Sequence, residues 1–338
     1  MRRTTIKDIA RVAGVSPGAV SFALNDRPGV SEATRARVKA VAAELGWTRS
    51  AAAAALSGRR AGALGLVLQH GEGDDHTEAF TLRFIAGVHR VLRPLQQSLV
   101  VQMVTSREEE LQTYRTWWGE RRVDGVLVLR PVVEDPRIAV LQELGMPAVM
   151  VGGPIDDGIG AVCADEERTT RVLVDHLAQL GHRRLGYIAG PHDWHYVRWR
   201  TEALRTRARQ LGLGVSVVHV NTRDEMAGMQ ASMRMLRGTE APTAVIYDNE
   251  LLTIGGVAAC HDAGLTVGRQ VCMASFEDSP ALRMQRPGIT ALRRRSEELG
   301  AMAATAVLAL ADGGAAQMEV GPMPELAVRA SSGRRQAQ

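Results

Sequence analysis

TTIKDIARVAGVSPGAVSFALN, residues 4–25, is the stretch that decides the fold of the amino-terminal part of this chain. It has the pattern of two short helices separated by a tight turn. Thr5 and Asp8 have the spacing of a capping box at the start of the first helix. Ser16 followed by Pro17 supplies an N-cap and a favourable first residue for the second helix. This arrangement is typical of the helix-turn-helix unit, whose second helix enters the major groove of DNA.

Apolar residues recur at helical spacing in three successive segments, the third of which begins at Ser31. The inward faces are Ile6, Ile9, Ala10 and Ala13 in the first segment, Val20, Ala23 and Leu24 in the second, and Thr34, Val38, Val41 and Leu45 in the third. The spacing predicts a small bundle of three helices around one core.

Positive charge is concentrated in the same part of the chain. Residues 1–60 contain 11 Lys/Arg and 4 Asp/Glu, an excess of seven positive charges, whereas the rest holds 30 and 33, an excess of three negative charges. Lysine and arginine side chains that neutralise DNA phosphates release counterions, which drives binding. Together with the helical pattern, the charge favours a double-stranded DNA partner over a merely solvated basic surface.

The whole chain limits the class of protein. Its 338 residues, 45% of them hydrophobic, predict two or three domains with real cores. No apolar run approaches the roughly 20 residues that span a membrane, and the basic start continues directly into a helix pattern rather than a secretion signal. Cys163, Cys260 and Cys272 lack the spacing of disulfides or metal sites and suit a reducing cytoplasm. We expect a cytoplasmic protein without a cofactor, a metal or a membrane partner.

Residues 50–58, SAAAAALSG, have a capping serine, five alanines and a closing glycine, all of which favour a helix. Helices shorter than about 12 residues are marginal in water unless they pack on a partner. The segment is therefore either a hinge helix that orders on docking or a passive alanine-rich linker.

Beyond residue 60 the chain alternates apolar runs with helical patterns, which predicts an α/β fold with doubly wound parallel sheets. The expected strands are residues 64–68, 99–104, 125–129, 148–152, 185–190, 215–220, 244–248 and 271–276, and the expected helices include residues 79–93, 108–121, 166–180 and 250–263. Eight buried strands exceed one compact unit, and the array divides near residues 154–161. Two α/β lobes would form a ligand cleft at the carboxyl ends of their strands.

The chain resembles the lactose/galactose repressor family, bacterial regulators that join a DNA-binding headpiece to a core like that of periplasmic binding proteins. The matching motifs are TIKDIARVAGVS, VSEATRARV and AAELGW in the first part, LSGRRAGALGLVL after residue 55, and RRVDGVLVL, DHLAQLGHRRLGYIAGP, PTAVIYDNELL, SFEDSP and EELGAMA beyond. They follow the family's order over nearly the whole chain.

The resemblance implies a domain plan. It comprises a headpiece at residues 1–49, a hinge at 50–60, a core at 61–333 and a disordered tail at 334–338. In the core, the N-lobe takes about 61–156 plus 292–318, and the C-lobe about 160–290 plus 319–333. A homodimer on a pseudo-palindromic operator is implied, with a small effector, by default a sugar, that closes the lobes. The tail has no apolar heptads, which argues against a tetramer.

The second helix departs from the family pattern at Phe22, where an arginine is common. The groove-facing set Pro17, Gly18 and Phe22 lacks side-chain donors, so arginine–guanine readout from these positions is excluded. Phe22 either touches a thymine methyl or packs on the headpiece core, and its helical phase favours the groove. The full expected DNA-contact set is Thr5, Ser16, Pro17, Gly18, Ser21, Phe22, Asn25 and Ser31 in the headpiece, and Ala53 and Leu56 in the hinge, where Leu56 wedges into the minor groove.

Candidate effector contacts follow from the resemblance, residue by residue. Arg200 matches a ligand-gripping arginine, Asn249 a ligand-contacting asparagine, and Glu277 a position that is usually aspartate. Their alternative roles are a solvated helix charge, a helix cap and a loop charge. The remaining candidates are Trp194, Trp199, Arg223 and Phe80, expected near the cleft, whereas glycine at Gly152 or Gly153 replaces a usual ligand acid.

Enzyme motifs are missing from the sequence: no dinucleotide-binding glycine pattern follows a strand, and there is neither a P-loop nor a nucleophile elbow. His192 and His195 could in principle bind a metal, but no further cluster of ligands is evident in the sequence, and ligand-contact or surface roles are favoured. The sequence therefore predicts a ligand-gated DNA-binding regulator rather than an enzyme. The alternative is a cytoplasmic small-molecule-binding protein or enzyme that uses the basic headpiece as an interaction module.

Overall fold

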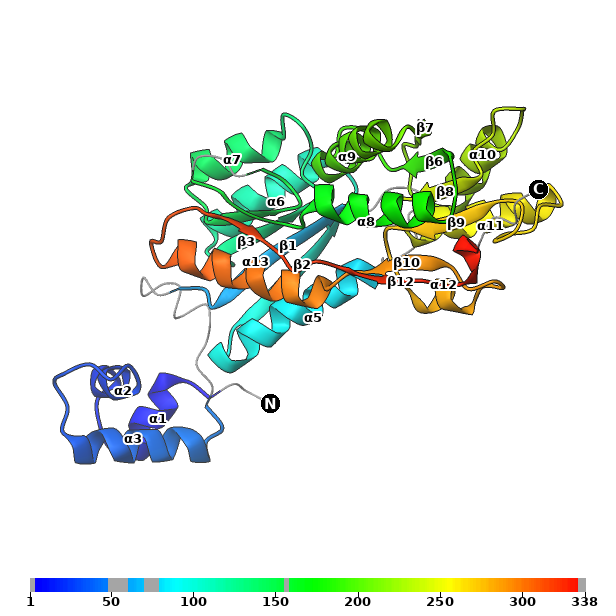
Figure 1. The fold of residues 1–338 in the computed structure, drawn as a ribbon. Helices are drawn as coiled ribbons and strands as arrows, with labels where there is room; N and C mark the ends of the chain where they lie inside the picture. The colour runs from blue at the N-terminus through cyan, green and yellow to red at the C-terminus, as the bar shows by residue number, and fades with distance from the viewer. Residues whose placement is uncertain (1–3, 48–59, 70–78, 155–157, 334–338) are drawn as a thin grey trace. The chain divides into compact units, whose positions relative to one another are not determined.

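The computed structural model describes residues 4–47, 60–69, 79–154 and 158–333 (Figure 1). The chain divides into two compact units between Ala61 and Gly62. Most of the predicted hinge, including Ala53 and Leu56, and the predicted tail lie outside the described residues. No helix in the described ranges is long and apolar enough to cross a membrane.

The first unit is the predicted three-helix bundle. Its helices are α1 (Ile6–Ala13), α2 (Pro17–Leu24) and α3 (Glu32–Glu44). The hydroxyl oxygens of Thr5, Ser16 and Ser31 accept hydrogen bonds from backbone N–H groups in the first turns of the three helices. Most of the predicted inward residues are buried, and Ile6, Thr34, Val41 and Leu45 are half-buried. The caps therefore set where each helix begins, and the apolar faces set how the helices pack.

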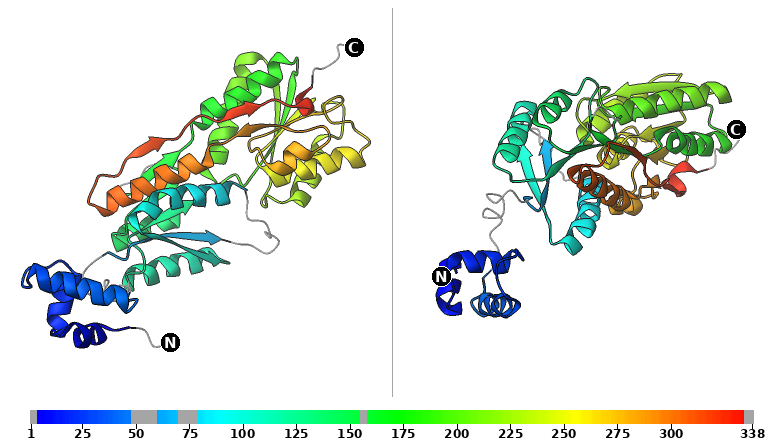
Figure 2. Two further views of the ribbon diagram at one scale, coloured as in Figure 1. Left: turned by 90° about the horizontal axis from the view of Figure 1, so that it is seen from below. Right: turned by 90° about the vertical axis from the view of Figure 1, so that its left-hand side faces the viewer.

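The second unit contains two six-stranded sheets (Figures 1 and 2). The first has the strand order β11-β5-β4-β3-β1-β2, and all of its pairs are parallel. Its strands are β1 (Ala63–Gln69), β2 (Ser98–Val104), β3 (Gly125–Leu129), β4 (Ala148–Val151), β5 (Gly160–Cys163) and β11 (Met318–Val320). Its helices are α5 (Ala79–Leu92), α6 (Arg107–Gly119), α7 (Pro136–Leu144) and α13 (Ser296–Ala311), with the short η1 (Arg93–Leu95).

The second sheet has the order β12-β10-β9-β8-β6-β7 and is parallel except for the antiparallel pair β10–β12. Its strands are β6 (Arg184–Ala189), β7 (Gly214–His219), β8 (Ala244–Tyr247), β9 (Cys272–Ser275), β10 (Thr290–Arg293) and β12 (Glu325–Ala327). Its helices are α8 (Glu166–Gln179), α9 (His195–Leu211), α10 (Glu225–Met235), α11 (Glu250–Asp262) and α12 (Pro280–Met284), with η2 (Ala330–Ser332) at the end.

Each sheet is covered by helices on both faces, as predicted for a doubly wound α/β fold. In the first lobe, α5 and α13 lie side by side on one face and α6 and α7 cover the other (Figures 1 and 2). In the second lobe, α8 and α9 cover one face and α10 and α11 the other. The strands are consequently buried on both sides, which explains their continuous apolar runs.

The lobe boundaries differ from the prediction. The chain first leaves the first lobe after Cys163, because β5 pairs with β4, whereas the sequence pattern placed the division at residues 154–161. It returns after Arg293, since β10 belongs to the second sheet, and leaves again after Val320. The predicted limits at 160, 292 and 318 therefore fall inside strands. Strands of three or four residues carry too little periodicity to be assigned to a sheet before their partners are known.

Candidate functional site

The exposed side of α2 is the candidate DNA-binding surface. Because Val20, Ala23 and Leu24 face the core, Pro17, Gly18 and Phe22 lie on the outside, with Ser21 half-buried beside them. This agrees with the predicted groove-facing set, although DNA contact itself stays a prediction.

Several of the predicted phosphate-contacting side chains also shape the bundle. The hydroxyls of Thr5, Ser16 and Ser31 cap their helices, and Asn25 Nδ2 donates to the Ser21 carbonyl at 2.8 Å. A capping hydroxyl oxygen accepts from the backbone and still carries a hydrogen that it can donate. The Thr5 hydroxyl donates this hydrogen to Asp8 Oδ2 at 2.6 Å, and the Ser31 hydroxyl lies 2.9 Å from Thr34 Oγ1. The Ser16 hydroxyl, which accepts from Ala19 N, can therefore also donate to a phosphate, whereas Thr5 can do so only by giving up its bond to Asp8.

Phe22 is 41% exposed, and part of its ring packs against the loop before α3. A Cβ built on Gly29 would lie 3.1 Å from Phe22 Cδ2, so the ring rests directly on this glycine. The two alternatives weighed from the sequence are therefore not exclusive: one part of the ring packs on the bundle and the rest faces solvent.

Arg35, which was not singled out from the sequence, connects the end of α2 to α3. Its Nη1 lies 3.4 Å from the Ala23 carbonyl oxygen and 3.3 Å from Asp26 Oδ1, and its Nη2 donates to the Arg27 carbonyl at 3.0 Å. The Lys39 ammonium, hydrogen-bonded to Asp26, together with Arg35 holds the pKa of Asp26 below its ordinary value. Two of the basic residues counted in the headpiece, Arg35 and Lys39, thus pair with Asp26 within the bundle.

Replacing Phe22 with alanine is expected to change which operator sequences are preferred, while the dependence of binding on salt stays nearly the same. The ring carries no charge, so its loss releases no counterion, whereas a contact with a base edge would be lost. Binding-site selection and a salt titration measure the two effects. Val12→Ala, which shortens an exposed apolar side chain on α1, is the control. Identical selected sequences for Phe22→Ala and the parent protein would refute the assignment.

In the second unit, two neighbouring cavities that share lining residues lie between the lobes at the carboxyl ends of their strands. The inner cavity, about 60 Å³, lies between Phe80, Leu129 and Val151 of the first lobe and Arg200, Arg223 and Glu277 of the second. The outer cavity, about 500 Å³, shares Leu129, Arg130 and Arg223 with it and extends to Gln69, Trp194 and Asn221. The cleft predicted from strand–helix alternation is therefore present.

Arg200 is at the centre of the inner cavity's charged wall and is only 2% exposed. Its Nε donates to Glu166 Oε2 at 2.8 Å, and its Nη1 donates to Asp248 Oδ1 at 2.5 Å. Its guanidinium carbon lies 4.5 and 4.4 Å from the ring centroids of Tyr196 and Phe276. Arg200 is thus at the predicted place, but two carboxylates of the protein already hold it.

Glu166 and Arg294 belong to the same network and were not singled out from the sequence. Arg294 Nη2 donates to both carboxylate oxygens of Glu166, at 2.8 and 2.7 Å. Burial alone would raise the pKa of Glu166, but the charges of Arg200 and Arg294 outweigh it and keep the pKa below the ordinary value. Glu166 opens α8 and Arg294 follows β10, so only the fold brings them together.

Asp248, directly after β8, lies between Arg200 and Arg223 and pairs with both of them. It is completely buried and accepts from the Tyr187 hydroxyl at 2.9 Å, while Arg223 Nε lies 3.2 Å from its Oδ2. Burial acts to raise the pKa of Asp248, and the charges of Arg200 and Arg223 lower it further than burial raises it. Arg223 Nη2 in turn lies 3.7 Å from Glu277 Oε1.

Trp194 links the two lobes. The guanidinium carbons of Arg130, from the first lobe, and Arg223, from the second, lie 5.3 and 5.4 Å from its ring centroid. Backbone bonds from Val133 N to the Asp193 carbonyl and from His195 N to the Pro131 carbonyl join the same two loops. Trp194 is therefore in the cleft as predicted, with cations already over its ring.

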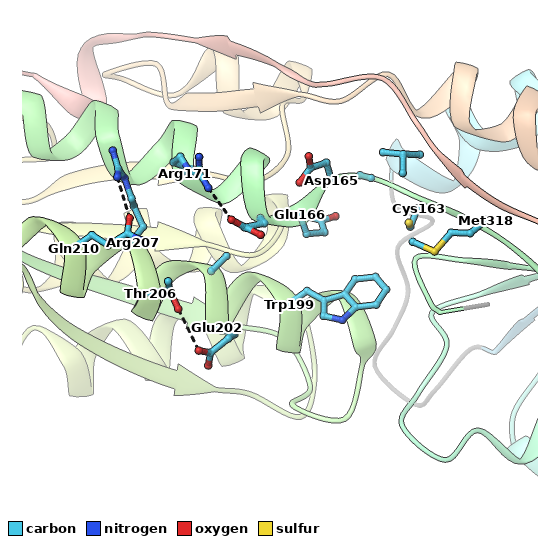
Figure 3. Close-up of a pocket in the computed structure, with 14 residues that line it drawn as sticks. Cys163, Asp165, Glu166, Arg171, Trp199, Glu202, Thr206, Arg207, Gln210 and Met318 are labelled. Carbon is cyan, nitrogen blue, oxygen red and sulfur yellow. Dashed lines mark hydrogen bonds and ion pairs between the residues drawn. The ribbon is translucent and has the colours of Figure 1, made fainter. Parts of the chain in front are cut away.

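Two predicted ligand residues lie elsewhere. Asn249 is 1% exposed and caps α11, since its Oδ1 accepts from Leu252 N at 3.0 Å and its Nδ2 donates to the Arg223 carbonyl. Trp199 lines neither of these cavities but a side groove between α8, α9 and β11, opposite Cys163 and Met318 (Figure 3). Trp199 and Arg200 are consecutive residues of α9, so their side chains point about 100° apart around the helix axis, which explains why only Arg200 enters the cleft.

The remaining candidates are placed as follows. Phe80 lines the inner cavity and stacks on Phe84, and Gly152 lies at the first-lobe wall, where an acid was expected from the family pattern. His192 lies near His219, and His195 near Trp199, so the two histidines have different neighbours. Within the described ranges, no group of three or more His, Cys, Asp or Glu residues is arranged to hold a metal ion.

Two family models match the chain. The model "Bacterial regulatory proteins, lacI family" matches residues 5–50, and the model "Periplasmic binding protein-like domain" matches residues 174–332. The first covers the three-helix bundle, and the second covers most of the second lobe and the end of the chain.

Relatives match over most of their length. The chain is 31% identical to the HTH-type transcriptional regulator AglR of Rhizobium meliloti (strain 1021), over 81% of this chain and 77% of the relative. It is 28% identical to the ribose operon repressor of Escherichia coli (strain K12), over 88% and 90% of the two chains. A solved structure of the transcriptional regulator CelR in complex with cellobiose matches with 26% identity and a TM-score of 0.74, over 97% of this chain and 100% of that one. This chain therefore belongs to the lacI family of bacterial regulatory proteins and is a DNA-binding transcriptional regulator.

Proposed function

We propose that this regulator is a cytoplasmic repressor, not an enzyme, that binds a pseudo-palindromic operator as a homodimer and is controlled by a small polar effector. The observation that carries the proposal is that one chain joins a helix-turn-helix bundle with an exposed second helix to a two-lobed core with a polar interlobe cavity. An effector that favours one lobe arrangement changes DNA affinity through linkage, typically by about 1–3 kcal/mol.

Exposed apolar side chains in the first lobe support the dimer. Leu82 on α5, Leu95 in η1, and Val101 and Met103 on β2 are all exposed, although each is large and hydrophobic. Val101 and Met103 are two residues apart on an edge strand and therefore point to the same side of the sheet. A second copy of this chain is the occupant that we propose for this surface.

The proposed DNA contacts are those of the exposed α2 face, together with the caps Thr5 and Ser31 and the hinge residues Ala53 and Leu56. The proposed effector contacts are Arg223, Glu277, Trp194 and Phe80, with Arg200 holding the wall in place. The names of two relatives refer to sugars, ribose and cellobiose, which supports a sugar-like effector here.

Footprinting on the DNA upstream of the protein's own coding sequence tests the proposal. We expect a protected site with two-fold symmetry, one half-site for each headpiece. Val101→Glu, at an exposed position whose substitution changes monomer stability by no more than about 0.5 kcal/mol, should yield a monomer with strongly weakened protection. Glu319→Gln, on β11 at the opposite edge of the same sheet, is the control. Salt-sensitive binding without a footprint would instead favour a small-molecule-binding protein with a basic interaction module.

A further inference from the structure

We infer that the effector carries an anionic group, a carboxylate or a phosphate, and that this group binds in the inner cavity. The inference rests on the proposed function, because it concerns the chemistry of the proposed effector site. It differs from the expectation of a neutral sugar, which needs acceptors for its hydroxyl hydrogens as well as donors for its oxygens.

The residues lining the inner cavity are rich in cations. They include four arginines, Arg130, Arg200, Arg223 and Arg294, but only two carboxylates, Glu166 and Glu277. Even with Asp248 behind this wall, the guanidinium groups outnumber the carboxylates. Guanidinium groups form strong bonds with carboxylate and phosphate oxygens, often through two parallel N–H donors.

The carboxylates have little capacity left for a neutral ligand. Both oxygens of Glu166 accept from Arg200 and Arg294, at 2.7 to 3.3 Å. Asp248 is completely buried among Arg200, Arg223 and Tyr187. Glu277, whose side chain is 17% exposed, is therefore the carboxylate that a ligand can reach most readily.

The first-lobe wall of the inner cavity adds few acceptors. Apart from Arg130, the described side chains there are apolar: Phe80, Leu129, Val151 and Leu299, with Gly152 beside them. A hydroxyl hydrogen buried against this wall would be left without a side-chain acceptor, which is energetically unfavourable. An anionic group has no such hydrogen and meets donors on the opposite wall.

The two cavities suit two parts of one ligand. The inner cavity, about 60 Å³, has room for a small group, whereas the outer cavity, about 500 Å³, has room for the rest of a metabolite. The outer cavity offers neutral polar side chains, Gln69, Asn221 and Thr222, together with Asp193 and Asp224, which suit hydroxyl groups. A sugar acid or a sugar phosphate has both parts.

The cations also come from both lobes, which gives an anion a means of favouring closure. Arg130 follows β3 in the first lobe with a positive φ of 50°, a conformation that costs a non-glycine residue energy and is frequent at functional sites. Arg223 follows β7 in the second lobe, and both lie over Trp194. An anion between them attracts both lobes at once.

Inorganic phosphate is the minimal probe, because it does not depend on sugar stereochemistry. The full chain is titrated with phosphate against chloride at constant ionic strength, and tryptophan fluorescence and the unfolding temperature are recorded. We expect a saturable response with a Kd on the order of 1 mM. Arg223→Gln and Arg130→Gln should each weaken it at least tenfold, and Arg207→Gln, whose arginine pairs with Asp175 outside the inner and outer cavities, should leave it unchanged.

A second experiment compares glucose, gluconate and glucose 6-phosphate as competitors of phosphate. Displacement of phosphate by gluconate or glucose 6-phosphate at lower concentration than by glucose supports the inference. No response of the parent protein to phosphate, an equal response in Arg223→Gln and Arg130→Gln, or stronger competition by the neutral sugar would each overturn it. The operator footprint is independent of these outcomes, so a failed anion assignment leaves the proposed function standing and a missing footprint refutes it separately.

Discussion

Replacing Arg200 with leucine is expected to lower the free energy of unfolding by about 3–5 kcal/mol at neutral pH. The substitution leaves Glu166 and Asp248, both buried, without the cation that lies between them. Losing one member of a buried ion pair is costly because the remaining charge keeps its desolvation penalty without the compensating attraction. Arg200 also holds the wall of the inner cavity in place, so the variant should lose its response to effector as well.

The loss of unfolding free energy caused by Arg200→Leu should become smaller as the pH falls. In the parent protein the pKa values of Glu166 and Asp248 are lowered, so their ion pairs contribute stability above the ordinary carboxylate pKa, and that contribution is lost as the pH falls through the folded-state values. In the variant, Arg294 remains beside Glu166 and Arg223 beside Asp248, but the loss of Arg200 raises both pKa values relative to the parent, so protonation in acid relieves part of the penalty. The difference between the two proteins is therefore largest near pH 7 and narrows toward about pH 4.

Urea unfolding of both proteins at a series of pH values measures this difference. Arg207→Leu is the matched control, since Arg207 pairs with Asp175 on the surface between α9 and α8 and such pairs contribute about 0–1 kcal/mol. A difference between Arg200→Leu and the parent that does not change with pH would show that the loss comes from packing rather than from the two carboxylates.

Replacing Gly300 with valine is expected to destabilise the first lobe by about 3 kcal/mol or more. A Cβ at Gly300 in α13 would lie 2.1 Å from the Phe84 carbonyl oxygen in α5, and a Cβ at Gly87 in α5 would lie 1.8 Å from the Glu297 carbonyl oxygen. The two helices thus touch through their backbones, and no side-chain rotation relieves the clash. Helix α13 would have to move away from α5 and from the sheet.

Gly119→Val is the control for this prediction. Gly119 also lies in a helix, α6, but a Cβ there meets no atom of the described structure within 4 Å. Its substitution should change the free energy of unfolding by no more than about 0.5 kcal/mol. Thermal unfolding followed by circular dichroism compares the two variants. Equal stability of Gly300→Val and Gly119→Val would mean that the two helices can separate without loss.

The headpiece was predictable in detail because its determinants are local. Thr5, Ser16 and Ser31 were read as helix starts, and each is an N-cap. Caps, turn glycines and apolar spacing act within a few residues, so they specify helices before any tertiary contact forms. The longer parallel strands were equally predictable, because burial on both faces requires continuous apolar runs.

The effector site was only partly predictable. Arg200, Arg223, Glu277, Trp194 and Phe80 lie in the cleft, but Asn249 turns inward as a cap and Trp199 faces another groove. Each outcome depends on the direction in which a side chain leaves its helix or cap position, and the family pattern does not define that direction.

By itself, the sequence determined the three-helix bundle, the α/β class of the core and the family, because these depend on local periodicity and on motifs in a fixed order. Only the tertiary structure decided that β5 and β11 complete the first sheet, that Glu166 meets Arg294, and that α5 touches α13 at glycines. These features join residues as many as 216 positions apart, as in the contact of Gly300 with Phe84. Their free energy comes from pairing, desolvation and close packing, which exist only once distant segments are in contact.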